Sequence, residues 1–466
     1  MSTEPIRTLL VANRGEIAVR IHRAAHDLGL RTVQAYSDAD EDSLAVRLAD
    51  ESVRIGPPPA AKSYLDTESV IAAAKASGAD AVHPGYGFLA ESAAFADAVT
   101  AAGLRFVGPD GDTIRLMGDK AAARAAAKEA GVPTVPGSDG VLAGPDEAAA
   151  LADALGFPLM IKASAGGGGR GIRIANDAKE LRRLATQASN EARAAFGDGG
   201  IYLEKVIGDA RHVEVQLLGD GTRVVHLFER ECSLQRRRQK VWEEAPSSAL
   251  DEATREAMCT AAVRLAEAVR YRGAGTVEFL FDEGSGEFHF IEMNTRIQVE
   301  HPVTEMLCGV DLVAAMIRVA GGEPLPFSQE AIRRDGHAIE VRINAEDPFA
   351  DFMPFPGTVE TLSVPDGPGT RFDHMLYAGY TVPPFYDSLL GKLIVHAEDR
   401  DAALRRLRRA LAELRIEGIK TTAPLFEALL DDEDVRRNAV HTGWLETWLD
   451  RDFDAATTSG EPRNHE

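Results

Sequence analysis

The stretch that decides the fold is residues 288–302, Phe-His-Phe-Ile-Glu-Met-Asn-Thr-Arg-Ile-Gln-Val-Glu-His-Pro. Odd-numbered positions from 291 to 299 are mostly apolar, whereas even-numbered positions from 292 to 300 are all polar. Because an extended chain sends alternate side chains to opposite faces, we expect a strand with one core face. The other face carries Glu292, Asn294, Arg296, Gln298 and Glu300. That many ionisable groups on one face indicate a ligand.

A second strand is expected just upstream. Residues 275–281 are rich in β-branched and aromatic side chains, and residues 282–287 have the composition of a turn. A hairpin centred on Ser285 places Glu278 opposite Glu292, with Cβ atoms roughly 4.5–5.5 Å apart. Two bare carboxylates repel at that distance, and Mg²⁺ removes the repulsion while binding substrate phosphates. The alternatives are a solvated hairpin face, or a one-residue change in register that separates the two side chains.

Length and composition limit the class of protein. The chain has 466 residues, enough for roughly three domains, and 45% of them are hydrophobic. The net charge of −22 disfavours binding to nucleic acid. No apolar run reaches the roughly 18 residues of a membrane span, and the first residues lack the pattern of a signal peptide, so a cytoplasmic protein is expected. The three cysteines, Cys232, Cys259 and Cys308, show no metal-ligand spacing.

The N-terminal region predicts a doubly wound, parallel α/β unit. Residues 7–12 read as a buried strand, residues 17–28 as an amphipathic helix and residues 31–36 as the next strand. The first loop lacks G-x-G-x-x-G, so nothing favours a dinucleotide site. The loop at 83–88 follows a further strand, where open α/β sheets bind ligands, although packing explains its His83 and Tyr86 equally well.

Two features downstream suggest anion binding. The strand at 159–162 ends in Lys162 and is followed by a glycine-rich segment, which has the composition of a mobile flap over a nucleotide or of a plain surface loop. If residues 233–240 are extended, Arg236, Arg238 and Lys240 share one face and suit a polyphosphate or bicarbonate; a solvated charge run is the alternative. Lys120 begins a helix, where a nearby anion or chance placement accounts for it.

The remaining chain predicts further α/β structure. We expect a helix at 303–320, an alternating strand at 338–344 and a basic amphipathic helix at 401–414. On the alternating strand, Glu340 and Arg342 share a face. The last dozen residues are polar, and we expect them to be disordered.

These motifs resemble the biotin carboxylase component of biotin-dependent carboxylases, which has the ATP-grasp fold. The matching stretches are residues 12–18, 83–88, 115–120, 162–164 with the following glycines, 290–305 and 342–348. The resemblance covers roughly residues 5–446. It implies an α/β fold, α+β in the ATP-grasp part. The implied domains are an N-terminal pre-ATP-grasp domain at 1–115, an ATP-grasp domain at 116–330 with a lid at about 134–204, a C-terminal α/β domain at 331–446 and a tail at 447–466.

The resemblance also implies a role for each matching residue. ATP phosphates are expected at Lys120, Lys162, Gly168 and Gly169. The adenosine is expected at Glu204, Lys205, Val206, Ile207 and His212. Mg²⁺ or Mn²⁺ is expected at Glu278, Glu292 and Asn294, and bicarbonate at Lys240, Arg296, Gln298 and Val299. Glu300 is then the general base, and Arg342 stabilises negative charge on the biotin ring.

The chain departs from the family pattern at two positions. Arg238 replaces the usual histidine in a predicted nucleotide contact, and Ala165 replaces a glycine at the edge of the flap. Because arginine is bulkier and always charged, nucleotide contact there is expected to differ. The change at Arg238 leaves open a regulatory or assembly subunit with a weakened site, and another ATP-grasp carboxylate–amine ligase is the other alternative.

Partners follow from the same resemblance. Biotin carrier domains present a lysine flanked by methionines, yet none of the nine methionines here is followed by lysine. We therefore expect biotin on another polypeptide or in a segment outside this chain, a carboxyltransferase on another chain, and a homodimer. The final carboxyl acceptor (acetyl-CoA, propionyl-CoA, pyruvate or another) is not encoded in these motifs.

Overall fold

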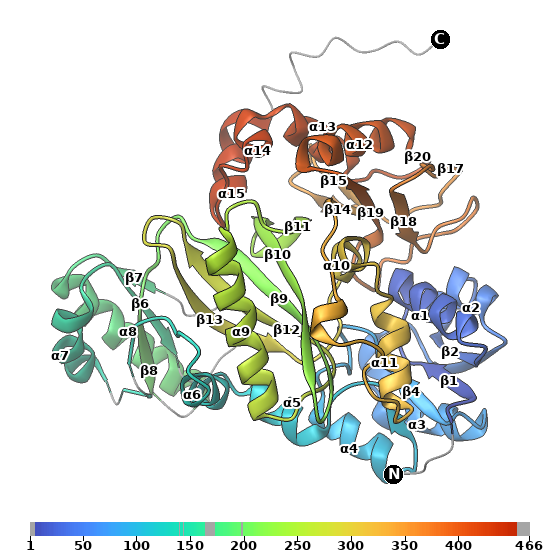
Figure 1. The fold of residues 1–466 in the computed structure, drawn as a ribbon, viewed down its shortest axis with the longest axis horizontal. Helices are drawn as coiled ribbons and strands as arrows, with labels where there is room; N and C mark the ends of the chain where they lie inside the picture. Colours follow the sequence, from blue (N-terminus) through green and yellow to red (C-terminus); the bar gives the residue numbers. More distant parts are fainter. Residues whose placement is uncertain (1–4, 139, 143, 164–172, 197–198, 454–466) are drawn as a thin grey trace.

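The computed structural model describes residues 5–138, 140–142, 144–163, 173–196 and 199–453. Figure 1 shows an N-terminal unit, a small unit in teal that projects to one side, and a large central sheet that continues into the C-terminal region. The predicted flap residues Ala165, Gly168 and Gly169, and the polar tail after residue 453, lie outside the described residues.

The N-terminal unit is the predicted parallel sheet, with strand order β3-β2-β1-β4-β5. Its strands are β1 (Thr8–Val11), β2 (Arg31–Ser37), β3 (Glu51–Gly56), β4 (Ala81–His83) and β5 (Arg105–Phe106). Its helices are α1 (Gly15–Asp27), α2 (Leu44–Leu48), α3 (Thr67–Ala76), α4 (Ala93–Ala101) and α5 (Gly111–Gly118). The strand order reverses between β1 and β4, so the loops after these two strands flank the crevice where open α/β sheets bind ligands.

The projecting unit is a three-stranded antiparallel sheet in the order β7-β6-β8. Its elements are β6 (Leu159–Ala163), β7 (Arg173–Ala175), β8 (Ile201–Lys205), α7 (Pro145–Leu155) and α8 (Ala178–Phe196). Leu159, Ile161 and Leu203 from the sheet pack with Leu181 of α8 in a core of their own. The core of this unit is therefore separate from that of the central sheet. Helix α6 (Lys120–Glu129) precedes it.

The central sheet is antiparallel, with strand order β13-β12-β9-β10-β11-β14-β19-β18. Its strands are β9 (Arg211–Asp220), β10 (Val224–Arg236), β11 (Gln239–Ala245), β12 (Arg272–Asp282), β13 (Glu287–Asn294), β14 (His337–Asn344), β18 (Thr370–His374) and β19 (Leu389–Ala397). Trp242 of β11 pairs with Val341 of β14, so one sheet continues across residue 330. The site residues on both sides of that position therefore share one rigid platform.

Helices and short strands complete the C-terminal half. The helices are α9 (Glu252–Ala268), α10 (His301–Cys308), α11 (Leu312–Ala320), α12 (Arg400–Glu413), α13 (Ala423–Asp431), α14 (Glu433–Arg436) and α15 (Trp444–Trp448). The short strands are β15 (Glu346–Asp347), β16 (Met353–Pro354), β17 (Thr361–Ser363) and β20 (Arg415–Glu417). Among the described residues, no helix combines the length and the apolar character that crossing a membrane requires.

The predicted hairpin register is confirmed at the site. Glu278 of β12 lies opposite Glu292 of β13. One residue nearer the turn the register shifts, and Phe279 pairs with Phe290, so Ile291 is the extra residue of a β-bulge. The turn is therefore not symmetric about Ser285. The bulge keeps the two carboxylates opposite each other despite the offset in the turn.

Two predictions about regular structure were wrong. The strand expected to run through Val299 ends at Asn294, because the chain must turn there to enter α10, whose first turn contains Pro302. The helix expected at 303–320 is divided into α10 and α11. Gly309 ends α10 in the left-handed conformation at φ +66°, where glycine carries no steric penalty.

The basic run at 233–240 is also not one extended strand. Strand β10 ends at Arg236 and β11 begins at Gln239, with Arg237 and Arg238 in a tight turn at φ +49° and +66°. Arg236 lies over the ring of Phe352 at 3.9 Å. The three predicted cations consequently do not share one strand face, although Arg236, Arg238 and Lys240 all line the same cavity.

Candidate active site

A row of carboxylates crosses three neighbouring strands of the central sheet. Glu278 on β12 lies opposite Glu292 on β13 and, on its other side, opposite Glu214 on β9. Glu214 and Glu278 are buried, and the Glu292 side chain is 40% exposed. Adjacent buried carboxylates need cations, and β10 places Arg230 opposite Glu214 at the end of the row.

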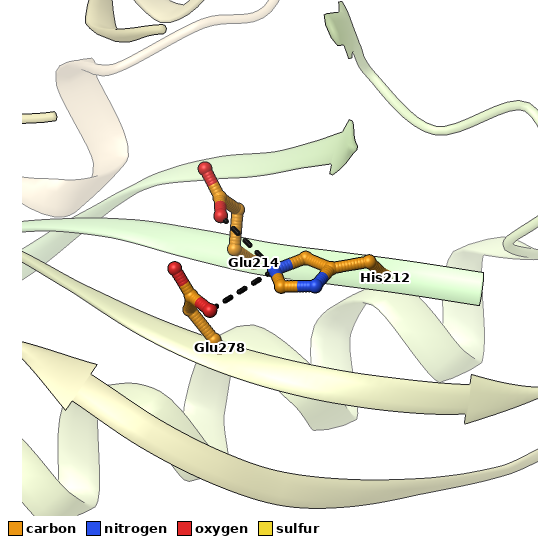
Figure 2. A group of neighbouring side chains, drawn as sticks. All are labelled: His212, Glu214 and Glu278. Atoms are coloured by element: carbon orange, nitrogen blue, oxygen red, sulfur yellow. Dashed lines mark ion pairs between the residues drawn. The ribbon is translucent and has the colours of Figure 1, made fainter. Parts of the chain in front are cut away.

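His212 lies beside Glu214 and Glu278 and can also carry a positive charge (Figure 2). Its Nε2 lies 3.1 Å from Oε2 of Glu278 and 3.4 Å from Oε2 of Glu214. Burial alone would lower the pKa of His212, but the two carboxylates outweigh it and raise that pKa to about 9. At neutral pH the ring is therefore an imidazolium between two acids.

Lys240 provides a second cation where β11 begins. Its Nζ forms an ion pair with Glu214 and lies 3.0 Å from Glu278 and 2.7 Å from Glu300. Burial opposes the charge, yet the three carboxylates hold the pKa of Lys240 well above its usual value. The pKa of Glu300 is held low in return, because Lys240 and Arg342 outweigh the cost of burial. Glu300 is thus ionised and able to accept a proton.

The irregular segment after β13 orients two more polar side chains. Arg296 donates from Nε to Glu91 at 2.9 Å and from Nη2 to Oδ1 of Asn294 at 2.8 Å. Gln298 donates from Nε2 to Glu278 at 2.8 Å, while its Oε1 accepts from Arg230 at 2.6 Å. Both amide atoms of Gln298 are therefore engaged, which fixes the orientation of that side chain.

Arg230 lies fully buried beneath the site. It donates to Glu214 at 2.8 Å through Nε, and its two terminal nitrogens donate to Gln216, Thr304, Thr276 and Gln298 at 2.6–3.2 Å. All five N–H donors of a guanidinium thus have side-chain acceptors. Sequence reasoning missed both Arg230 and Glu214. The only signal for Glu214 was its place two residues after His212 in an alternating strand.

Arg342 on β14 closes the far side of the site. It donates to Oε1 of Glu243 at 2.7 Å and to Oε2 of Glu300 at 3.0 Å. Burial would lower its pKa, but Glu243 and Glu300 raise it. Arg342 and the groups above surround a cavity of about 680 Å³ that also reaches Tyr86 in the loop after β4.

The structure brings most of the predicted site residues to this one cavity. The predicted residues that line it are His212, Arg238, Lys240, Glu278, Glu292, Asn294, Arg296, Gln298, Val299, Glu300 and Arg342. Lys120 is not in the lining, but its Nζ lies 3.6 Å from Oε2 of Glu292. Lys120 thereby places a cation at the acidic end of the carboxylate row.

The predicted nucleotide residues of the projecting unit lie outside this cavity lining. Lys162 of β6 is paired with Glu204 of β8, and neither belongs to the cavity lining. The backbone N–H groups of Lys205 and Val206 donate to the carbonyls of Pro136 and Pro158, so both donors already have partners. Ile207 follows them, half-buried at the end of the segment.

The residues present fit a hard divalent cation. Glu278 and Glu292 offer facing carboxylate oxygens, which Mg²⁺ and Mn²⁺ prefer. Asn294 donates from Nδ2 to Glu278 at 3.1 Å and accepts from Arg296 at Oδ1, whose second lone pair is the one that can bind a cation. His212, Glu214 and Glu278 also lie with their Nε2 and carboxylate oxygen atoms within 4.8 Å of one another, but the imidazolium of His212 has no lone pair to offer a cation.

Three family models match the chain in succession. They are "Biotin carboxylase, N-terminal domain" at residues 5–114, "Carbamoyl-phosphate synthase L chain, ATP binding domain" at 119–328 and "Biotin carboxylase C-terminal domain" at 340–447.

Individual proteins are similar to this chain over almost its full length. Biotin carboxylase of Pseudomonas aeruginosa is 52% identical over 449 residues, which cover 96% of this chain and 99% of the relative. The crystal structure of a Campylobacter jejuni biotin carboxylase–β,γ-ATP complex superposes with a TM-score of 0.90 at 46% identity, covering 96% of this chain and 99% of that one. The biotin carboxylase domain dimer of Hydrogenobacter thermophilus 2-oxoglutarate carboxylase, solved with MgADP, ADP and bicarbonate, gives 0.88 at 49% identity, covering 96% and 98%. The chain therefore belongs to the biotin carboxylase family and has its ATP-grasp fold.

Proposed function

We propose that this chain is an ATP-dependent ligase that carboxylates biotin on a separate carrier protein, with bicarbonate as the source of the carboxyl group. One observation carries the proposal: Glu278, which faces Glu292, contacts the cation Lys240, and Lys240 contacts the base Glu300. In that arrangement, the binding site for a metal–nucleotide complex lies next to the binding site for a small anion. The similarity to biotin carboxylases over the whole chain supports it.

The nucleotide half of the site has to neutralise phosphoryl charge. A cation held by Glu278, Glu292 and Asn294 supplies Lewis-acid stabilisation of that charge when bound. Lys120 lies beside Glu292, where it can pair with a phosphate oxygen. Lys162, now paired with Glu204, is proposed to exchange that carboxylate for a phosphate oxygen. Gly168 and Gly169 are proposed to complete the phosphate contacts, and residues 204–207 with His212 to contact the adenosine.

The bicarbonate half has to hold an anion and remove its proton. Bicarbonate is a poor electrophile, and phosphorylation by ATP converts it to carboxyphosphate. We assign its binding to Lys240, Arg296, Gln298 and Val299. Glu300 is the base, because its ionised form is stabilised by Lys240 at 2.7 Å and Arg342 at 3.0 Å. Arg342 then serves the biotin side, where its fixed positive charge stabilises negative charge on the ring.

The wider assembly is part of the proposal. The family acts with a biotin carrier and a carboxyltransferase, and we place both on other chains, with this chain as a homodimer in the cytoplasm. We further propose functional divisions at residues 1–115, 116–330 and 331–446, with the lid at about 134–204.

The test is ATP hydrolysis by purified protein with Mg²⁺, measured with and without bicarbonate and free biotin. We expect hydrolysis to depend on bicarbonate and to rise with biotin, and Glu300→Gln to abolish that dependence. A matched control is Glu360→Gln, because Glu360 is an exposed glutamate that does not line the cavity. A rate of ATP hydrolysis that changes with neither bicarbonate nor biotin would refute the function.

Arg238 favours a second candidate, a regulatory subunit with a weakened site. Its side chain lines the cavity from a turn in the left-handed conformation at φ +66°. A bulky, permanently charged side chain in that place alters nucleotide contact. Restoring histidine distinguishes this candidate from an active enzyme.

A further inference from the structure

Two fully buried carboxyl groups face each other behind the site. Glu243 on β11 pairs in register with Glu340 on β14, and both are 0% exposed. Facing residues of an antiparallel pair have Cβ atoms roughly 4.5–5.5 Å apart. Oε1 of Glu243 accepts from Arg342, but its Oε2 and both oxygens of Glu340 accept no hydrogen bond from any described residue. Buried acceptors of this kind are costly unless a donor is present.

The cations around Glu340 are committed to other partners. On its own strand, Arg342 donates to Glu243 and Glu300. On β19, Lys392 donates to the Val299 carbonyl at 2.8 Å and pairs with Glu16 at 3.1 Å.

Helix α10, which packs on the same face of β14, supplies no positive charge to compensate Glu340. Burial lowers the pKa of His301, so its ring is neutral, and Glu305 is engaged by Arg20 and Arg371. On the other face of β14, α12 packs against the apolar side chains of Ile339 and Val341.

We propose that Glu340 is a neutral carboxylic acid whose O–H donates a hydrogen bond to Oε2 of Glu243. This one bond supplies partners to the facing oxygens of both side chains. Burial and the charge of Glu243 also raise the pKa of Glu340 well above its usual value, and burial raises the pKa of Glu243 to about 7. Burial and the facing carboxyl group therefore both favour a proton on this pair, and we place it on Glu340.

The consequence for the reaction passes through Arg342. With Oε2 held by Glu340, the carboxylate plane of Glu243 is fixed and its Oε1 faces Nε of Arg342. Arg342 is then held against Glu300. Glu340 is thus a positioning residue three contacts away from the base, with Glu243 and Arg342 between them. This consequence rests on the proposed function, whereas the hydrogen bond itself does not.

Infrared difference spectroscopy tests the protonation directly, without any activity. At neutral pH, the spectrum of wild type minus Glu340→Gln should contain the carbonyl stretch of a protonated carboxylic acid, shifted in D₂O. Wild type minus Glu360→Gln, an exposed control, should contain only ionised-carboxylate bands. Ionised-carboxylate bands in the Glu340 difference spectrum would overturn the proposal.

Kinetics test the positioning role. Glutamine at 340 keeps an N–H donor for Glu243, whereas leucine has similar bulk and no donor. We therefore expect Glu340→Leu to lower the rate of biotin carboxylation about tenfold, the order of one orphaned buried acceptor, and Glu340→Gln to recover most of that loss. Because ionisation of Glu340 removes the donor that holds Glu243, activity should fall at a lower pH in wild type than in Glu340→Gln. Equal rates for the two variants, or identical alkaline limbs for wild type and Glu340→Gln, would refute the role. An inactive wild type would instead refute the proposed function.

Discussion

Replacing Arg230 by lysine tests whether the buried guanidinium organises the site. Arg230→Lys keeps the positive charge beside Glu214 but offers three donors on one nitrogen in place of five on a planar fork. The five acceptors come from four elements: β9, β12, α10 and the segment that carries Gln298. One ammonium group cannot reach all of them.

The magnitude follows from the acceptors left behind. At least two of the five lose their donor, and each unsatisfied buried acceptor costs about 1–3 kcal/mol, so we expect a loss of about 2–6 kcal/mol of stability. Gln298 accepts from Arg230 at 2.6 Å, and without that bond its amide is free to turn away from Glu278. We expect the KM for bicarbonate to rise about tenfold, equivalent to about 1.4 kcal/mol, with the KM for ATP little changed.

The assay is bicarbonate-dependent ATP hydrolysis with either substrate varied, alongside chemical denaturation of the same preparations. Arg264→Lys is a matched control, because that arginine is exposed and, within the part of the chain that the structure describes, donates only to the Gly131 carbonyl. An unchanged KM for bicarbonate in folded Arg230→Lys, or an equal rise in the KM for ATP, would refute the reasoning.

Three further predictions concern metal, pH and the nucleotide contact. Glu292→Gln should leave folding unchanged, because the side chain is half-exposed, and should raise the Mg²⁺ concentration for half-maximal activity about tenfold. An unchanged Mg²⁺ titration would contradict the assignment of Glu292 as a ligand. The pKa of His212 is raised to about 9. The imidazolium therefore contributes fully to the free energy of unfolding below its ordinary pKa of 6.5, and this contribution is lost as pH rises through about 9. Chemical denaturation between pH 6.5 and 9 should show a smaller pH dependence of that free energy in His212→Asn than in wild type. Arg238→His should change turnover little, because histidine tolerates the left-handed turn; a sharp rise would instead favour the regulatory subunit.

Local patterns in the sequence predicted much of the fold and the centre of the site. Alternation over residues 288–302 and a short turn placed Glu278 opposite Glu292, because strand periodicity and hairpin pairing act between near neighbours in the chain. The β-α-β pattern near residue 10 predicted the parallel sheet for the same reason. The roles of Gln298 and Arg342 came from the resemblance to biotin carboxylases, whereas the basic run at 233–240 had already indicated an anion at Lys240.

Only the tertiary structure decided what surrounds that centre. Arg230 contacts Gln298, 68 residues away, and Arg342 contacts Glu243, 99 residues away. Such pairs depend on the order of strands in the central sheet, which hydrophobic periodicity does not encode. Buried Glu340 likewise looked like any polar position of an alternating strand. Its facing carboxyl and its committed cations exist only once β11, β14 and β19 lie side by side, because burial and long-range pairing determine the charge of a buried group.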